Sequence, residues 1–464
     1  MKNQESGYVN ITGLDKYKMF FRFFNQAFKL LAHRYNREQR ISNGLTVGDS
    51  LFNFFKLSFL EYTVLKHRNM VRFGDKVIVD STVPPFPSPA FDRRLSNYLN
   101  YFDMQDIPSG IVSISTTNLC PYSCPFCSTN SRRISKADLD EELIIQTIKE
   151  IERLGTPMII LHGGEPMFRY ERFLRIVKSV DRETCLWMFT TGYGVTPERA
   201  RDLQENGLFG VWVSLDHFDP AVHNALRGHP QAFEKAQEAV KAFKEAGVYT
   251  CLSLVPPDDF IDPLNFRKYY EMAKNMGVAE IRVMEKKPSG REACNGVIPH
   301  SPVLACLQQE LFADPSYSDY PPLSGLSTWL EKDEALGCQC RFEYLFVTAS
   351  GDVQPCEVSE ISFGNIKEEP FEDIFKRVSR AFEHCSTGCI PMVMYPEIRE
   401  YQRIRGKLNQ EEKNQLSESI VRGFSLRGRI PGAYKPIWNH YQRRLQSYRK
   451  RNKSSVDTVC GMGH

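Results

Sequence analysis

The sequence lacks the features that mark a secreted or membrane-spanning chain. Its 464 residues contain no uninterrupted apolar run of 18, so no transmembrane helix is predicted. The first residues, Met1-Lys-Asn-Gln-Glu5, lack the apolar core of a signal peptide. A large charge of either sign is also missing: the formal net charge is +3, which by itself indicates no particular partner. We therefore expect a cytoplasmic location.

What the chain has is a substantial apolar content and a grouped set of cysteines. Apolar residues make up 42% of the sequence, enough for a sizeable buried core, and the length suggests two to three domains. The 13 cysteines are odd in number and concentrate in two segments, 120–127 and 338–389. That distribution favours metal ligation in a reducing compartment over a disulfide framework. The isolated cysteines are expected to be ordinary thiols.

The first cysteine group is the segment Cys120-Pro-Tyr-Ser-Cys124-Pro-Phe-Cys127. Three thiolates at this CxxxCxxC spacing can bind three corners of a cubane iron–sulfur cluster. No fourth cysteine follows closely, which would leave one iron open for chemistry, as a catalytic zinc keeps an open position. A structural zinc site and a disulfide loop are the alternatives. Zinc favours paired CxxC arms with four ligands, and a disulfide needs an oxidising compartment, so the cluster is the better interpretation.

The surrounding residues add further motifs. An apolar run at 111–115 leads into the cysteine loop, Phe126 precedes the third cysteine, and His162-Gly-Gly-Glu-Pro166 follows another apolar run. With these motifs the chain resembles the radical S-adenosylmethionine (radical SAM) enzymes. The resemblance implies that Cys120, Cys124 and Cys127 hold a [4Fe–4S] cluster whose open iron takes the amino and carboxylate groups of S-adenosylmethionine. It also implies that Phe126 packs near the adenine and that the GGEP motif contacts the methionine amino group through Gly163, Gly164, Glu165 and Pro166.

Strand and helix patterns alternate from residue 111 to about residue 289. Apolar runs predict strands at 111–115, 158–161, 186–190, 211–215, 250–255 and 280–284. Helical patterns lie between them at 141–154, 198–205, 232–246 and 263–276. Repeated strand–helix–strand units produce a parallel sheet with right-handed crossovers. We predict an α/β fold, a partial (βα)6 parallel barrel as in the resembled family, with a helical N-terminal extension and a small Cys-rich C-terminal domain.

Ligands of parallel sheets bind beyond the carboxyl ends of the strands, where the cysteine loop and segments 162–166, 190–192 and 214–216 fall. The resemblance implies that Ser214 contacts the S-adenosylmethionine carboxylate or ribose and that Arg227 pairs with that carboxylate. A guanidinium suits this role because it meets a carboxylate bidentately, although Arg227 could instead form a surface salt bridge. Thr191 replaces an Asn or Asp common in relatives. Asp216 and His217 could be polar caps of the strand end.

The second cysteine group is more spread out. The pattern over residues 343–355 predicts a β-hairpin with its turn at 350–352. The spacing from Cys340 through Gly351 to Cys356, followed by Gly364-Asn-Ile, resembles the first half of the SPASM/twitch extension of radical SAM enzymes. The CxxC-x5-C run of a full, two-cluster SPASM domain is missing, so a twitch-like single auxiliary iron–sulfur cluster is expected. Its implied ligands, with Cys338 spare or competing, are Cys340, Cys356, Cys385 and Cys389. A zinc ribbon is the alternative, since four cysteines suit either metal.

The two ends of the chain are less informative. Helices are predicted over 15–34 and 49–65, both aromatic-rich, followed by a hairpin over 70–79. Such helices can lie in a membrane interface, but packing against the barrel or each other is the more common arrangement. The region after residue 396 is helical and charged, with a basic segment at 436–453. The expected domains are an N-terminal extension (1–108), the radical SAM core (109–299), the auxiliary-cluster domain (300–395) and a basic helical tail (396–464).

The resemblance implies an enzyme that reductively cleaves S-adenosylmethionine to a 5′-deoxyadenosyl radical, which then abstracts hydrogen from a substrate carbon. It implies a flavodoxin or ferredoxin as electron donor. A peptide or protein substrate and a lipid substrate are equally compatible, the latter with peripheral membrane contact. A non-catalytic iron–sulfur or zinc protein, acting as an electron carrier or scaffold, is the alternative. It does not account for GGEP, Phe126 and Ser214 on one rim. No nucleic-acid-binding signature is present, so no nucleic-acid partner is expected.

Overall fold

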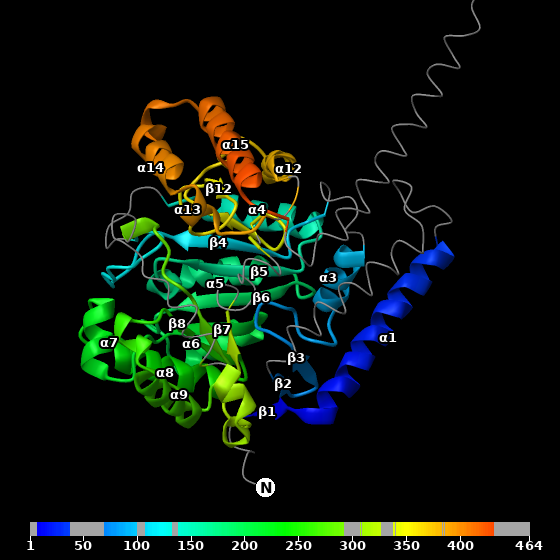
Figure 1. Cartoon of the computed structure of the whole chain (residues 1–464), viewed down its shortest axis with the longest axis vertical. Helices are drawn as coiled ribbons and strands as arrows, with labels where there is room; N and C mark the ends of the chain where they lie inside the picture. The colour runs from blue at the N-terminus through cyan, green and yellow to red at the C-terminus, as the bar shows by residue number, and fades with distance from the viewer. Residues whose placement is uncertain are drawn as a thin grey trace, which may run out of the picture.

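The fold is described from a computed structural model of the chain. The structure describes residues 7–37, 69–99, 107–131, 138–291, 307, 309–325, 337–338, 340–382, 384 and 386–430. Figure 1 shows a central sheet with helices α7, α8 and α9 along one side of it, helices α12 to α15 above one end, and the long helix α1 on the opposite side. The predicted helix over 49–65 and the basic segment at 436–453 lie outside the described residues.

The central sheet has nine strands in the order β10-β9-β8-β7-β6-β5-β4-β11-β12. Strands β4 to β9 are all parallel, as the strand–helix alternation predicts. Their bounds are β4 (Ile111–Thr117), β5 (Met158–Gly163), β6 (Cys185–Thr190), β7 (Leu208–Ser214), β8 (Tyr249–Leu254) and β9 (Ile281–Val283). The predicted α/β fold with a partial parallel barrel is confirmed.

Helices cover the outer face of the sheet because each carries one apolar stripe. They are α4 (Glu141–Arg153), α5 (Tyr170–Ser179), α6 (Pro197–Glu205), α7 (Pro220–Arg227), α8 (Ala232–Glu245) and α9 (Pro263–Met276). In α4, Ile144, Ile148 and Ile151 are fully buried against outward-facing strand residues such as Val112 and Ile114. Helices α5 and α7 were missing from the sequence interpretation.

Several of these helices begin at a capping residue followed by proline. Thr196, Asp219 and Asp262 each accept a hydrogen bond from a backbone N–H of the first turn of α6, α7 and α9, and proline occupies the first helical position. Proline is suited to that position because its missing N–H would have no helical partner there. The helices that support the barrel rim are therefore delimited by local sequence.

The inner face of the barrel is aromatic at its amino-terminal end. Trp187 and Trp212 stack at 4.1 Å between ring centroids, and both are fully buried. A three-stranded sheet of β1 (Tyr8–Ile11), β2 (Met70–Phe73) and β3 (Lys76–Ile78) packs onto this core through Tyr8, whose hydroxyl donates to the carbonyl of Val248 at 3.1 Å. The predicted hairpin over 70–79 is confirmed as β2–β3. The predicted helix over 15–34 is confirmed as α1 (Gly13–Arg37).

The C-terminal region is joined directly to the barrel. The predicted hairpin forms as β11 (Tyr344–Val347) and β12 (Val353–Gln354), and β11 pairs in parallel with β4. At the other end of the sheet, β10 (Leu323–Ser324) pairs in parallel with β9. The helices that follow are α12 (Phe371–Ala381), α13 (Ile390–Val393), α14 (Tyr395–Ile404) and α15 (Gln410–Arg427). Within the described ranges, no helix is long and apolar enough to cross a lipid bilayer.

Candidate active site

The GGEP motif lies directly against the start of the cysteine loop. Gly164 N–H donates to the carbonyl of Thr117 at 2.7 Å, and Glu165 N–H donates to the carbonyl of Leu119 at 2.8 Å. A Cβ added to Gly164 would lie 2.0 Å from the carbonyl oxygen of Leu119, and one added to Gly163 would lie 2.2 Å from that of Thr117. Gly163 also has a φ of +139°, a conformation that L side chains rarely adopt. Both glycines are needed for this close backbone contact.

Glu165 is fully buried and accepts hydrogen bonds from the carboxyl end of β6. Its carboxylate accepts from the hydroxyl of Thr190 at 2.8 Å, from the backbone N–H of Thr191 at 2.7 Å and from the Thr191 hydroxyl at 2.5 Å. Its fourth donor is the N–H of Met167 at 3.1 Å. Burial raises the pKa of Glu165, and these hydrogen bonds oppose that shift. Thr191 is therefore a structural partner of the GGEP glutamate.

The three thiols of the first cysteine group share one pocket. Cys120 and Cys124 are buried and Cys127 is half-buried; Tyr122, Phe126, Tyr193 and Ala232 pack around them, and none of the thiols forms a disulfide. The backbone N–H of Ser131 donates to Cys127 Sγ at 3.4 Å, which suits a thiolate ligand. Three soft thiols in one cluster of side chains, one of them with a backbone N–H donor, have the ligand chemistry of an iron–sulfur cluster.

Arg227 is buried between the cysteine loop and β7. Its guanidinium lies 5.4 Å from the centroid of the Phe126 ring, its Nε is 2.6 Å from Asp216 Oδ2, and its Nη1 is 3.9 Å from Cys124 Sγ. Burial opposes the positive charge, but Asp216 and Cys124 together raise the pKa of Arg227 above its usual range. The observed pair is an enclosed one with Asp216, unlike a surface salt bridge. Contact of Arg227 or Ser214 with S-adenosylmethionine stays a prediction.

Two residues that the sequence interpretation missed also hold the cysteine loop. The backbone N–H of Arg291 donates to the carbonyl of Cys127 at 3.0 Å, and its Nη1 donates to that of Cys124 at 2.7 Å. Gly290 lies so close that a Cβ there would be 2.1 Å from the Cys127 carbonyl oxygen. Gly290 N–H also donates to Glu360 Oε1 at 3.1 Å, which links the loop to the C-terminal region. Only the tertiary structure brings these segments together, 163 residues apart along the chain for Cys127 and Gly290.

The second cysteine group is assembled from separate segments. Cys340 is buried beside the thiols of Cys338 and Cys356, which raise the pKa of the Cys340 thiol together with burial. The N–H of Cys338 donates to the carbonyl of Ser386 at 2.8 Å, so segment 386–389 lies beside it. Cys389 precedes α13, and Cys385 lies outside the described residues. Cys338 is therefore a neighbour of Cys340, its part as a spare or competing ligand stays a prediction, and the soft thiol set has the ligand chemistry of an auxiliary iron–sulfur cluster.

A set of polar side chains centred on Glu357 lies inside the barrel. Glu357, next to Cys356, accepts from the hydroxyl of Tyr344 at 2.6 Å and from that of Ser113 at 3.2 Å. His162 Nε2 lies 3.6 Å from Glu357 Oε1. Burial lowers the pKa of His162, against the opposing effect of Glu357, which favours the neutral imidazole. The position of Glu357 directly after a candidate ligand was the one sequence signal that could have identified it.

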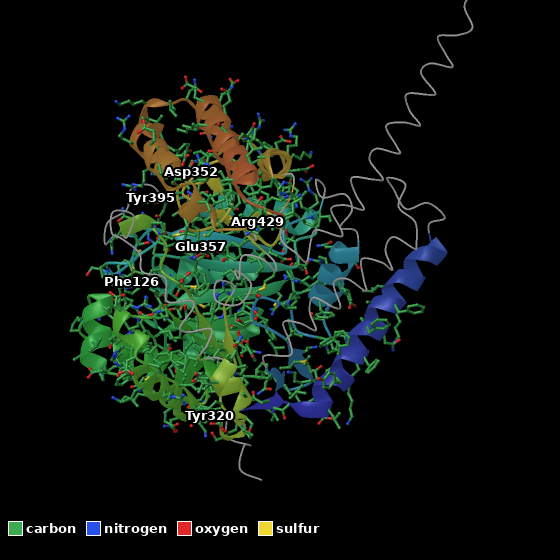
Figure 2. All side chains as sticks on the ribbon, in the orientation of Figure 1. Phe126, Tyr320, Asp352, Glu357, Tyr395 and Arg429 are labelled. Carbon is green, nitrogen blue, oxygen red and sulfur yellow. The ribbon has the colours of Figure 1, made fainter. Side chains whose placement is uncertain are left out.

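A polar cavity of about 430 Å³ opens between the barrel rim and the C-terminal region. Ser115, Asn118 and the segment 128–130 form its wall on the barrel side. The opposite wall comes from the β11–β12 hairpin, the loop carrying Glu357 and Glu360, and the start of the C-terminal helices, with Arg405 and Lys413. Figure 2 shows Asp352 next to helix α14 and Glu357 lower, at the level of β4, with Phe126 farther toward α7. The cavity therefore lies beside the cysteine loop and contains groups of both charges.

Comparisons with known proteins agree with this geometry. Residues 114–263 match the family model of the radical SAM superfamily. The chain therefore contains a radical SAM domain and is an enzyme. Residues 338–389 match an iron–sulfur cluster-binding domain, SPASM. A radical SAM domain implies a [4Fe–4S] cluster and S-adenosylmethionine, and a SPASM domain implies auxiliary iron–sulfur clusters. The sequence prediction of this family is confirmed, while the number of auxiliary clusters stays a prediction.

The radical SAM chain is similar to proteins of more than one activity. The AdoMet-dependent heme synthase of Nitratidesulfovibrio vulgaris is 23% identical over 298 residues, covering 58% of this chain and 78% of the relative. The PqqA peptide cyclase of Streptomyces rochei is 26% identical over 285 residues, covering 59% and 77%. The crystal structure of Streptococcus suis SuiB bound to the precursor peptide SuiA aligns with a TM-score of 0.51 at 12% identity, covering 62% of this chain and 69% of that one. That last likeness shows a shared fold.

Proposed function

We propose that this radical SAM enzyme abstracts a hydrogen atom from a polar substrate bound in the cavity between the barrel rim and the SPASM domain. The observation that carries the proposal is the position of this cavity, which shares its barrel-side wall with the loop following Cys127. When bound, the cluster and S-adenosylmethionine supply a 5′-deoxyadenosyl radical. The chain itself must position one C–H bond and exclude water and competing hydrogen donors.

Residues of the rim have distinct roles in this proposal. Cys120, Cys124 and Cys127 hold the cluster, Phe126 packs near the adenine, and the GGEP loop receives the methionine amino group. Ser214 lies at the carboxyl end of β7, where it can reach the ribose or carboxylate. Arg227 is already paired with Asp216, so its role in this proposal is to hold the side chains next to Cys124 and Phe126 in place. Glu357 faces both the cavity and the barrel interior, where a carboxylate can accept a proton from an oxidised substrate.

The lining of the cavity favours a peptide-type substrate over a lipid. Hydroxyl, amide and charged side chains make up most of its lining, so an acyl chain would find few apolar contacts there. Helix α1 does expose Leu14, Phe21 and Phe28. It lies on the side of the molecule away from the C-terminal helices that line the cavity, so a membrane contact there would not deliver substrate to this site (Figure 1). The names of PqqA peptide cyclase and of SuiB with its precursor peptide support a peptide.

A tetrapyrrole is the second candidate substrate. It is supported by relatives named AdoMet-dependent heme synthase, at 22% and 23% identity. Either substrate would react next to the auxiliary site, because Glu357 in the cavity wall directly follows Cys356. The auxiliary cluster would accept an electron from the substrate radical or bind the substrate, and a flavodoxin or ferredoxin would supply the electron that starts turnover.

The test is anaerobic reconstitution with iron and sulfide, followed by dithionite, S-adenosylmethionine and an assay for 5′-deoxyadenosine. We expect release of 5′-deoxyadenosine by the wild-type protein and its loss in Cys124→Ala. About eight irons per chain would indicate a cubane at each cysteine group, and about four would leave the second group to zinc or to no metal. A protein that forms its cluster but neither binds nor cleaves S-adenosylmethionine would contradict the proposal and favour an electron carrier or scaffold.

A further inference from the structure

Arg282 is a buried cation in the barrel interior that the proposed radical chemistry leaves without a role. It points inward from β9 and is 6% exposed. Its guanidinium lies 4.9 Å from the ring centroid of Trp212 and 5.7 Å from that of Phe189, so it rests on the aromatic floor of the barrel. Cation–π contact stabilises one face of the guanidinium but does not satisfy its N–H groups. Nε and Nη1 are enclosed and have no hydrogen-bond partner in the described structure.

The carboxylates around Arg282 are already engaged elsewhere. Glu280, on the same face of the strand, accepts hydrogen bonds from the hydroxyls of Ser81 and Ser324. Glu357 accepts from Tyr344 and Ser113, and no carboxylate of the described residues lies within 4.0 Å of Arg282. The charge of Arg282 reaches Tyr344, because it lowers the pKa of that phenol against the larger opposing effect of burial. An arginine retained in such a place without an anion is costly, which indicates that a ligand supplies one.

The position of Arg282 places that anion close to the reacting centre. Strand register aligns Arg282 with Ser253 of β8, and Ser253 with Ser214 of β7. The interior then continues from Phe189 to the His162 ring, at 6.1 Å, and on to Phe346 in the cavity wall, at 5.2 Å. A series of side chains in contact therefore runs from the cavity wall past His162 to the aromatic rings next to Arg282.

We propose that Arg282 binds a carboxylate of the substrate inside the barrel, level with Ser214, and so selects substrates that carry one. This inference rests on the proposed function and specifies its substrate class. A single negative charge suits the site because Glu357 contributes another nearby, which disfavours a dianionic phosphate. The guanidinium lies against the Trp212 ring, and its planar shape and fixed charge suit a carboxylate. An acidic peptide side chain and a tetrapyrrole propionate share this chemistry.

The methionine carboxylate of S-adenosylmethionine is the other possible source, and the test separates the two. Reconstituted protein with S-adenosylmethionine is titrated anaerobically with two matched probe pairs. The first pair is a capped Gly-Gly-Glu-Gly-Gly peptide and its Gln counterpart. The second is a propionate-bearing porphyrin and its methyl ester. Affinities are measured by calorimetry for wild type, Arg282→Gln and Arg282→Lys. Arg175→Gln, which removes an exposed guanidinium paired with Glu141, is the matched control.

We expect at least one carboxylate probe to bind about tenfold or more tightly than its neutral partner in wild type and in Arg175→Gln. That preference should disappear in Arg282→Gln and survive in part in Arg282→Lys. Equal affinity for both members of both pairs in wild type overturns the proposal without any variant. Unchanged probe discrimination in a cluster-loaded Arg282→Gln also overturns it.

Affinity for S-adenosylmethionine, measured on the same samples, decides the source of the carboxylate. We expect it to be equal in wild type and Arg282→Gln, and a drop as large as that for the probes would assign Arg282 to the cofactor instead. Release of 5′-deoxyadenosine without substrate reports on the proposed function separately. If the protein prefers the carboxylate probe but does not cleave S-adenosylmethionine, the proposed function is contradicted and the inferred binding site stands.

Discussion

The two cysteine groups of this chain differ in how they are built. Cys120, Cys124 and Cys127 lie within eight residues, and the loop that carries them is packed against three glycines: Gly164, Gly228 and Gly290. The second group draws Cys338, Cys340 and Cys356 together from segments on either side of β11 and β12, and places them beside residues 386–389. The candidate ligands of the first group are therefore close together in the sequence, whereas those of the second group are brought together by the sheet that aligns their segments.

The two groups are nevertheless connected. Strand β11, which follows Cys340, pairs with β4, which leads into the first group. Gly290 contacts the Cys127 carbonyl on one side and donates to Glu360 on the other. A structural change at one group can therefore be transmitted to the other through the backbone. The predictions below distinguish substitutions that affect one cysteine group from substitutions that affect both.

The largest effect is expected from Gly164→Ala. The new Cβ would overlap the Leu119 carbonyl oxygen at 2.0 Å, so the GGEP loop and the cysteine loop must move apart. A shift of about 1 Å in a reactive site costs on the order of a hundredfold in rate, and we expect that loss in 5′-deoxyadenosine release. Gly247→Ala is the control: Gly247 has a φ of +76°, a backbone strain that Gly164 does not share, but no atom lies within 4 Å of the added Cβ. Equal rates in the two variants would show that the contact is not needed.

A smaller effect on S-adenosylmethionine cleavage is expected from Cys356→Ala. This change removes an auxiliary ligand but leaves the first cysteine loop and its hydrogen bonds in place. We expect the loss of up to about four irons per chain, with cleavage of S-adenosylmethionine within about threefold of wild type and no modified substrate. Cys185→Ala, which alters a buried thiol on the barrel floor, should keep all its iron. Collapse of cleavage in Cys356→Ala alone would mean that the first group depends on the second.

The smallest expected effect is on the pH dependence of folding stability, and it concerns His223. Burial, with Arg227 and His217 adding to it, lowers the pKa of His223 to about 3, from 6.5. The folded protein therefore keeps this imidazole neutral, and its contribution to stability is complete above pH 6.5 and is lost as the pH falls toward 3. At pH 5 the loss amounts to about 2 kcal/mol.

The measurement is denaturant unfolding of wild type and His223→Asn between pH 7.5 and about pH 5. Asparagine retains an acceptor for the backbone N–H of Asp216, which donates to His223 Nδ1 at 3.1 Å. The variant should be less sensitive to acid than wild type by about 2 kcal/mol over this interval. Parallel curves for the two proteins would show that His223 titrates in the folded state as it does in water.

Much of the barrel could be predicted because its strands and several of its helices carry local signals. Strands are continuous apolar runs, and α4 and α9 have capping residues at their first turns. Helix α5 was missed because it follows the short helix Pro166–Arg169 without a side-chain cap, and α7 because it has only eight residues. The pairing of β11 with β4 and of β10 with β9 carried no local signal, since those strands are short and their partners are distant.

The sequence by itself determined the cluster-binding loop, the GGEP motif and the family, because cluster ligation at this group uses residues within eight positions and glycines at fixed offsets. Only the tertiary structure decided that Arg227 pairs with Asp216, that Arg291 holds the cysteine loop, and that Glu357 and His162 meet inside the barrel. It also decided that Arg282 lies buried with no hydrogen-bond partner for Nε and Nη1 among the described residues. These relations depend on strand order and on which face of each strand turns inward, and a charged residue within an apolar run does not reveal its partner until the sheet has closed around it.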